Sequence, residues 1–153
     1  TLAGDVVQIK YSGVPAVGNP INSLFMGAAF GSTNGPGFGW EDTTVYKIGV
    51  TYDLNPSVTL RAGYLTLKQP IPSSQTFLNI LAPGVVEDHI TLGATWKTGT
   101  NGELTVMYMH AFEKTVNGQG SIPPGAPPGG MGGGEANLRM SQDSLGIAYG
   151  WKY

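Results

Sequence analysis

The sequence predicts an all-β protein, a transmembrane antiparallel β-barrel of which this chain supplies about six strands. Three observations support this: six segments alternate apolar with small or polar residues, short turns alternate with long loops, and charge is nearly absent inside the segments. Charged residues make up only 12% of the 153 residues, about half the soluble average of roughly 25%. The net charge of -2 argues against nucleic acid as a partner, because phosphate recognition needs a basic face.

Each alternating segment is about 10–12 residues long. A tilted strand that crosses a membrane needs about 9–11 residues, whereas ordinary strands favour about 5–6. The predicted strands are approximately 2–11, 43–53, 57–67, 88–97, 103–112 and 142–153.

Sorting each strand by face separates apolar from small or polar residues. In the segment 43–53, Tyr46, Ile48 and Val50 share one face, and Gly49 and Thr51 share the other. The apolar faces carry aromatic residues near their ends, as in the girdles of outer-membrane barrels, and the opposite faces suit a wet lumen. The first segment fits least well, because its expected polar face contains Val6.

The connections between strands alternate in length. Tight turns are predicted at Asn55-Pro56 and Gly99-Thr100-Asn101, and long loops at about 12–42, 68–87 and 113–141. Segregation of short turns and long loops to opposite sides is typical of outer-membrane barrels. A charged collar is predicted where strands meet the long loops: Glu41, Asp42, Lys68, Glu87, Asp88, Glu113, Lys114, Glu135 and Arg139.

The last strand, "SLGIAYGWKY", alternates to its end. Outer-membrane proteins carry an aromatic-ended final strand that the barrel-assembly machinery recognises. Gly146, Tyr149, Trp151 and Tyr153 stand at the offsets of that assembly signal, which makes the machinery an expected partner.

Several stretches resemble the FadL-type outer-membrane transporters of long-chain fatty acids and hydrocarbons. "NGPGFGWEDTTVYKIGVTYDLNPSVTLRAGY" resembles their tenth and eleventh strands, and "PIPSSQTFLNILAPGVVEDHITLGATW" the following loop and twelfth strand. "ELTVMYMHAF" resembles their penultimate strand. The resemblance implies a fourteen-stranded barrel with an N-terminal plug, of which residues 1–153 form the C-terminal part. It also implies passive transport of hydrophobic compounds across the bacterial outer membrane, with membrane lipid and a hydrophobic ligand as partners.

Six such strands are not expected to close by themselves, because single-chain bacterial barrels begin at eight strands. Open sheet edges in lipid would also leave backbone groups unpaired. We therefore expect the remaining strands on the same precursor or on a second chain, and the chain to be a fragment, a partial structure or one piece of a split barrel. The lack of an initial methionine and of a signal peptide suggests a mature or truncated chain.

Two cations, Lys47 and Arg61, face inward by register on neighbouring strands. In one interpretation, either residue attracts the carboxylate of a fatty acid. In the other, each forms a structural ion pair with a carboxylate on strands or a plug outside this chain, which would also relieve repulsion between the two cations.

The long loops contain uncharged stretches over residues 11–40, 69–86 and 115–134. Their apolar side chains could form a groove that admits a hydrophobic ligand, or could pack together to cap the barrel mouth. The resembled family has a basic residue before the tenth strand that can meet the ligand head group, and "NGPGFGW" lacks one, which leaves neutral hydrocarbons open. The candidate ligand-binding residues in the loops are Phe25, Met26, Phe30, Phe38, Trp40, Phe77, Leu78, Ile80 and Leu81.

Catalysis, a metal site and a cofactor are not expected. The chain has no cysteine, and His89 and His110 fall on opposite faces of different strands. The pairs Glu41-Asp42 and Glu87-Asp88 resemble a calcium site, although a solvated collar is the simpler interpretation. Two other hypotheses remain: a surface interaction or structural protein without transport activity, and a soluble β-sandwich that happens to alternate.

Overall fold

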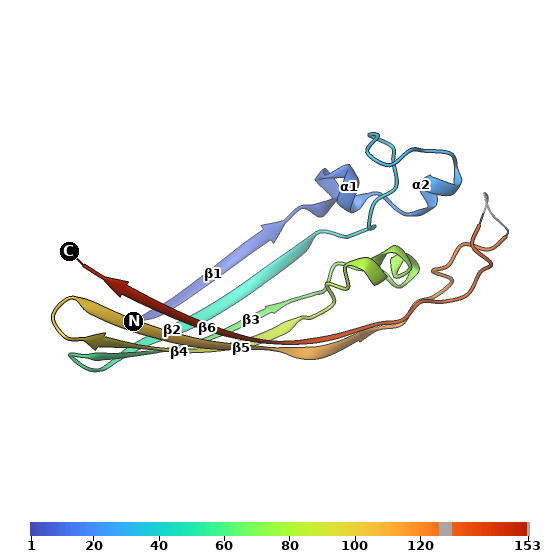
Figure 1. The fold of residues 1–153 in the computed structure, drawn as a ribbon. Helices are drawn as coiled ribbons and strands as arrows, with labels where there is room; N and C mark the ends of the chain where they lie inside the picture. The colour runs from blue at the N-terminus through green and yellow to red at the C-terminus, as the bar shows by residue number, and fades with distance from the viewer. Residues whose placement is uncertain (126–129, 153) are drawn as a thin grey trace.

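In the computed structural model, which describes residues 1–125 and 130–152, six strands form one antiparallel sheet in the order β1-β2-β3-β4-β5-β6. The strands are β1 (Leu2–Ile9), β2 (Thr43–Asn55), β3 (Val58–Leu67), β4 (Asp88–Thr98), β5 (Gly102–Val116) and β6 (Leu138–Trp151). The sheet is curved, with the long loops gathered at one end and the short turns at the other (Figure 1). This arrangement confirms the predicted all-β, antiparallel fold and its segregated connections.

The helices of the described residues are short and lie in the first two long loops. They are η1 (Tyr11–Gly13), α1 (Pro15–Gly18), α2 (Asn22–Phe25), η2 (Ser73–Gln75) and η3 (Leu78–Leu81). None of the helices in residues 1–125 and 130–152 is long and apolar enough to cross a membrane.

The register sorts the sheet into the two predicted faces. On the apolar face, Val50 of β2 stands opposite Ala62 of β3, which stands opposite Leu92 of β4. On the polar face, Gly49 stands opposite Gly63 in the same way. The large side chains of the apolar face are exposed along the sheet, so residues 1–125 and 130–152 do not cover them.

The expectation that Val6 lies on the polar face is wrong. The register places Val6 opposite Tyr46, on the apolar face, because β1 pairs Leu2 with Val50. Strand β1 nevertheless follows the alternation only in part, because the same register places Val7 on the polar face opposite Val45 and Gln8 on the apolar face opposite Thr44. It ends at Ile9 rather than near residue 11, because Tyr11–Gly13 turns into a 3-10 helix.

The last two strands are longer than predicted. Pairing in the β5–β6 hairpin stops at Ala111 and resumes at Lys114, so an irregularity lets the ladder continue to Val116 and Leu138. Of the predicted loop 113–141, residues 113–116 therefore belong to β5 and residues 138–141 to β6, and the described residues that remain as loop are 117–125 and 130–137. The alternation pattern did not predict this extension, because an extra residue in β5 reverses the face to which all later residues of that strand point.

The buried core lies at the loop end of the sheet. Ile71, Val85, Val116 and Leu138 form it, and Trp40 packs against it from the first loop. In the described part of the chain all strands belong to the one sheet, with no second sheet against it. The sandwich hypothesis is therefore wrong, because neither sheet face is covered by another layer.

Candidate functional site

The two cations of the polar face have different surroundings. The Lys47 Nζ lies 3.4 Å from Asp5 Oδ2, and the two residues face each other across β1 and β2. The sequence led us to expect that any carboxylate paired with Lys47 would lie outside this chain, but the structure supplies Asp5 from within it. Both side chains are substantially exposed, so the pair contributes little to stability, but it neutralises Lys47.

Arg61 is bound by a hydroxyl group rather than by a carboxylate. Its Nη1 donates to Thr95 Oγ1 at 2.6 Å, and Thr95 Oγ1 lies 2.9 Å from Thr105 Oγ1. Within residues 1–125 and 130–152, no ion pair involves Arg61. Lys47 stands opposite Leu65, and Arg61 stands opposite Thr51. The two cations are thus four residues apart along the strands, about 13 Å between Cα atoms, so their charges repel each other only weakly.

A buried asparagine joins the first two long loops. Asn79 is fully buried, and its Nδ2 donates to the carbonyls of Phe38 and Gln75, each at 2.7 Å. Its Oδ1 accepts from Trp40 Nε1 at 2.6 Å. Trp40 also packs edge-on against Tyr11, with ring centroids 5.0 Å apart. One side chain thus satisfies three polar groups that would otherwise be unpaired.

Further contacts make the three loops a single body, which we call the loop cap (the described residues among 10–42, 68–87 and 117–137). Gln75 Oε1 accepts from the Ile21 amide at 3.0 Å. The Gln119 amide of the third loop donates to Ser73 O at 3.0 Å. Gly39 has a φ of +67°, and a Cβ there would lie 2.5 Å from Gln75 Cγ, so only glycine fits.

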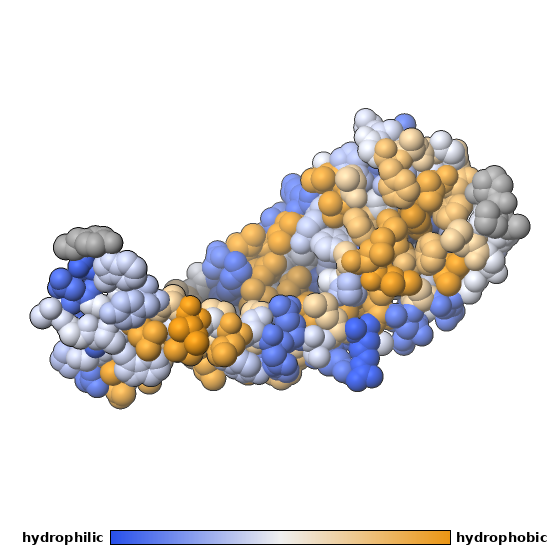
Figure 2. Space-filling view, in the orientation of Figure 1, coloured by the Kyte–Doolittle hydropathy of each residue, from blue (hydrophilic) through white to orange (hydrophobic). Residues whose placement is uncertain are grey.

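The nine apolar loop residues divide between packing and exposure. Five are half-buried in the loop cap: Phe25, Phe38, Trp40, Phe77 and Leu78. Four are exposed: Met26 (78%), Phe30 (62%), Ile80 (56%) and Leu81 (78%). Figure 2 shows apolar surface gathered over this loop end as well as along the sheet. The half-buried residues therefore pack within the loops, as expected for a cap, while the exposed residues form an open apolar surface. Ligand binding by these residues remains a prediction.

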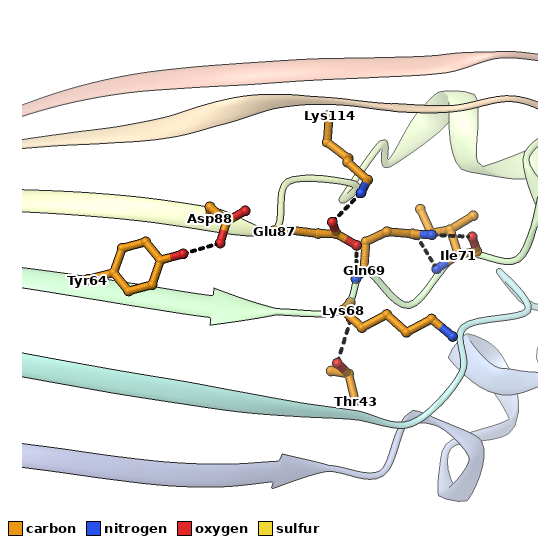
Figure 3. A network of polar contacts seen from close by, with 8 residues as sticks. All are labelled: Thr43, Tyr64, Lys68, Gln69, Ile71, Glu87, Asp88 and Lys114. Atoms are coloured by element: carbon orange, nitrogen blue, oxygen red, sulfur yellow. Dashed lines mark hydrogen bonds and ion pairs between the residues drawn. The ribbon is translucent and has the colours of Figure 1, made fainter.

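The charged collar contains a network at the base of the second loop (Figure 3). Glu87 accepts from the Gln69 amide at 3.1 Å through Oε1 and pairs with Lys114 through Oε2. The Gln69 side chain binds both the amide and the carbonyl of Ile71. These contacts fix the second loop to β4 and β5, so this part of the collar is structural as well as solvated.

Asp42 is the collar residue that anchors the first loop. The Ser12 amide donates to Asp42 Oδ1 at 2.9 Å and lowers the pKa of this exposed carboxyl below its ordinary value. Over the described residues, no three His, Cys, Asp or Glu side chains come together in a group that could hold a metal ion.

The two histidines lie on opposite faces, as predicted. His89 stands opposite Leu65 on the polar face, and His110 opposite Ile90 on the apolar face. His110 Nδ1 lies 2.8 Å from Asp143 Oδ1, and this pair lies toward the loop end of the strands.

The final strand displays the residues of the predicted assembly signal on both faces. Gly146 stands opposite Met107 on the polar face. Tyr149 and Trp151 lie on the apolar face, with ring centroids 6.0 Å apart. Tyr153 lies outside the described residues, and recognition of this strand remains a prediction.

Sequence reasoning missed Asn79, Gln75 and Asp5. Asn79 had a usable signal, since it is a lone amide in the apolar run "FLNIL", and a buried amide needs partners. Asp5 had a weaker signal, because pairing with Lys47 depends on a register that the sequence does not specify.

Comparisons with known proteins give a family and a similar fold. The model of a family described as "Outer membrane protein transport protein (OMPP1/FadL/TodX)" matches residues 3–149. The crystal structure of the P. putida toluene transporter TodX is similar, with a TM-score of 0.60 and 15% sequence identity. The alignment covers 99% of this chain and 30% of that chain, so the likeness is to part of that fold. No curated protein matches the sequence.

Proposed function

The chain belongs to the family of outer membrane transport proteins that includes FadL and TodX, and on this premise we propose that it forms part of a barrel wall through which hydrophobic compounds cross the bacterial outer membrane. Membership in this family confirms the resemblance found in the sequence. The fold is that of part of the family's barrel, since the chain spans about 30% of the length of TodX.

The two faces of the sheet support a position in the membrane wall. Exposed Ile48, Leu92 and Ile147 belong to a face that is apolar along the strands, which suits contact with lipid. The other face presents glycine, threonine and a few charges, which suits a lumen. We propose an outer-membrane, multi-pass location, with lipid, the barrel-assembly machinery and further barrel strands as partners.

The loop cap supplies the observation that carries the proposed transport function. Met26, Phe30 and Leu81 remain exposed on loops that the buried hub at Asn79 holds together. Mobile apolar side chains would collapse together in water, whereas a packed support keeps some of them accessible to a ligand. In this mechanism the loop cap captures the compound, the polar face guides it, and release follows its concentration gradient without a cofactor.

The test is uptake by vesicles that contain the protein in its complete barrel. We expect the triple variant Met26→Ser, Phe30→Ser and Leu81→Ser to reduce uptake of a hydrocarbon such as toluene about tenfold, with normal assembly. The reason is that each exposed apolar residue contributes roughly 1 kcal/mol or less to capture. The matched control is Leu54→Ser, which removes an exposed apolar side chain at the short-turn end of β2.

Equal uptake by the triple variant and the control would refute capture by the loop cap. Vesicles that take up no hydrophobic compound, although the protein is assembled, would instead favour the other function considered, a surface interaction or structural protein without transport. The exposed side chains of the loop cap would then be a surface for a partner.

A further inference from the structure

We propose that the head groups of the outer leaflet meet the apolar face of the sheet along a line that crosses the strands obliquely, and that two tyrosine–aspartate pairs anchor the sheet to them. The pairs are Tyr64 with Asp88 and Tyr108 with Asp143. This inference rests on the proposed membrane location and is independent of transport. It concerns the face directed away from the lumen, and on β3, β4 and β5 both neighbouring strands belong to this chain.

The two pairs have the same geometry. Tyr64 stands opposite Ile90, and its hydroxyl donates at 2.5 Å to Asp88, the next residue toward the loops on that face of β4 (Figure 3). Tyr108 donates at 2.5 Å to Asp143, which lies two residues closer to the loops than its own partner position on β6. Each tyrosine thus keeps its ring on the apolar face and directs its hydroxyl toward the loop end, as aromatic residues do at a membrane interface.

The apolar face ends at a level that descends from β2 to β6. We call a row the residues that the register places side by side across the strands, so successive rows on one face are two residues apart along a strand. On β2 the apolar residues continue to Tyr46, in the row of Asp88. On β4 they end one row lower at Ile90, in the row of Asp143, and on β6 one row lower again at Leu145. The edge of the apolar face therefore falls by one row for every two strands.

This slope is the one that tilted strands require. A row spacing is about 6.8 Å and two strands span about 9.6 Å, so the edge makes an angle of about 35° with the rows. Strands of outer-membrane barrels tilt by about 35–45°, so an edge at this angle lies parallel to the membrane plane. The two pairs follow it, because Asp143 lies two strands and one row from Asp88.

Beyond the edge, the same face of the last hairpin is polar. Arg139 lies four residues beyond Asp143 toward the loops and pairs with the exposed Glu113 at 2.6 Å. On the opposite face of this extension, Val116 and Leu138 belong to the core of the loop cap. The end of the β5–β6 hairpin therefore stands above the head groups and supports the loop cap there.

The pairs resist movement of the sheet in either direction. Sinking would bring the carboxylates of Asp88 and Asp143 among the acyl chains, where a charge costs more with increasing depth. Rising would expose Ile90 and Leu145, in the rows below them, to water, and removal of apolar side chains from water is what stabilises them in lipid.

The first test measures the depth of single positions on this face with nitroxide labels. The chain contains no cysteine, so each introduced cysteine gives one labelled position in the complete barrel, once any cysteine of the other strands is replaced by serine. In phosphatidylcholine vesicles, the accessibility of the label to oxygen and to a water-soluble nickel complex reports its depth. The variants are Ile48→Cys, Ile90→Cys, Leu92→Cys and Ile147→Cys.

These positions distinguish an oblique edge from one that follows the rows. Ile48 and Ile90 share a row, whereas Ile48, Leu92 and Ile147 lie on a line that falls one row for every two strands. We expect the labels at 48, 92 and 147 to lie at equal depth. The label at 90 should lie nearer the loop-side surface by about 5–6 Å, which is one row projected on the membrane normal.

The second test removes the anchors. The variant Tyr64→Phe, Asp88→Leu, Tyr108→Phe and Asp143→Leu extends the apolar face toward the loops, so the sheet should sink and the label at 90 should move toward the bilayer centre by about 3 Å, half a row. The matched control is Thr91→Leu with Ser144→Leu. It adds apolar side chains next to Ile90 and Asp143 but on the polar face, and should leave the label in place.

Equal depths at 48 and 90, with 92 deeper, would overturn the oblique edge. A label that keeps its depth in the variant without anchors would overturn the role of the two pairs. Labels open to the nickel complex at all four positions would remove the membrane location itself. Labels on the expected line in a barrel that passes no compound would support this inference and refute transport alone.

Discussion

The sheet and the loop cap reverse the usual places of core and surface. Along the strands, large apolar residues such as Leu145 (71%) and Ile147 (68%) are exposed. In the loops, which are ordinarily the wettest part of a protein, Ile71, Val85 and Asn79 are fully buried. The loop cap therefore has a buried interior like that of a small soluble domain. The sheet has no buried interior, and its two faces suit two different surroundings, one apolar and one polar.

The difference shows that each region is adapted to its own surroundings. A strand with one apolar face stabilises a fold only when something apolar covers that face, and for this family the cover is lipid. A loop in water has no such cover, so its apolar residues pack on one another and its polar backbone groups need internal partners. Asn79 and Gln75 provide those partners in the loop cap.

The largest expected effect comes from placing a charge on the apolar face. Leu92→Arg should destabilise the membrane-inserted protein by about 2–4 kcal/mol, because Leu92 lies near mid-strand on the apolar face, which we propose contacts lipid. Thr91→Arg changes the adjacent residue, which faces the polar side, and should cost much less. Urea titration of both variants in lipid vesicles measures the difference. Equal destabilisation would break the assignment of the two faces.

A smaller effect, confined to the loop cap, is expected at its hub. Asn79→Ala leaves Trp40 Nε1 and two carbonyls without their partner, and should destabilise the cap by about 2 kcal/mol. Hydrogen exchange should accelerate in the loops and stay slow in the strands. The control is Asn34→Ala, an exposed asparagine of the first loop. Strands that exchange as fast as the loops would show that the two regions are not independent.

The smallest effect concerns acid. The Ser12 amide lowers the pKa of Asp42, so the carboxylate is favoured in the folded state and its contribution is present above the ordinary pKa of 3.8. That contribution is lost as the pH falls below 3.8 and through the lowered folded value. An NMR titration of Asp42 should give a pKa below 3.8. A value at or above 3.8 would mean that the Ser12 contact does not form in solution.

Much of the sheet was predictable because successive side chains of a strand point to opposite faces, so every second residue matches the surroundings of one face. Tyr46, Ile48 and Val50 alternate with Lys47 and Gly49, and the register confirmed both faces. Alternation gave the wrong face for Val6 and missed the strand beyond Ala111. The reason is that alternation shows only which residues of one strand share a face, and not which face of the sheet that is. Pairing with the neighbouring strand fixes the absolute face, and an extra residue in β5 shifts it.

The candidate site was less predictable, because its properties depend on pairs of distant residues. The sequence named Lys47 and Arg61 as equals, and only the tertiary structure separated them through Asp5, which lies 42 residues from Lys47, and Thr95, which lies 34 residues from Arg61. The sequence likewise identified the apolar loops but not which side chains they bury.

The sequence by itself thus determined the strands, most of their faces and the apolar character of the loops, because these follow from local periodicity and composition. It indicated the family separately, through stretches that resemble those of known members. Tertiary structure decided the register, the partner of each cation and the division of the loops into buried and exposed residues. Those properties arise from contacts between segments far apart in the chain, and a contact energy of about 1 kcal/mol between two such residues leaves no periodic trace in either segment.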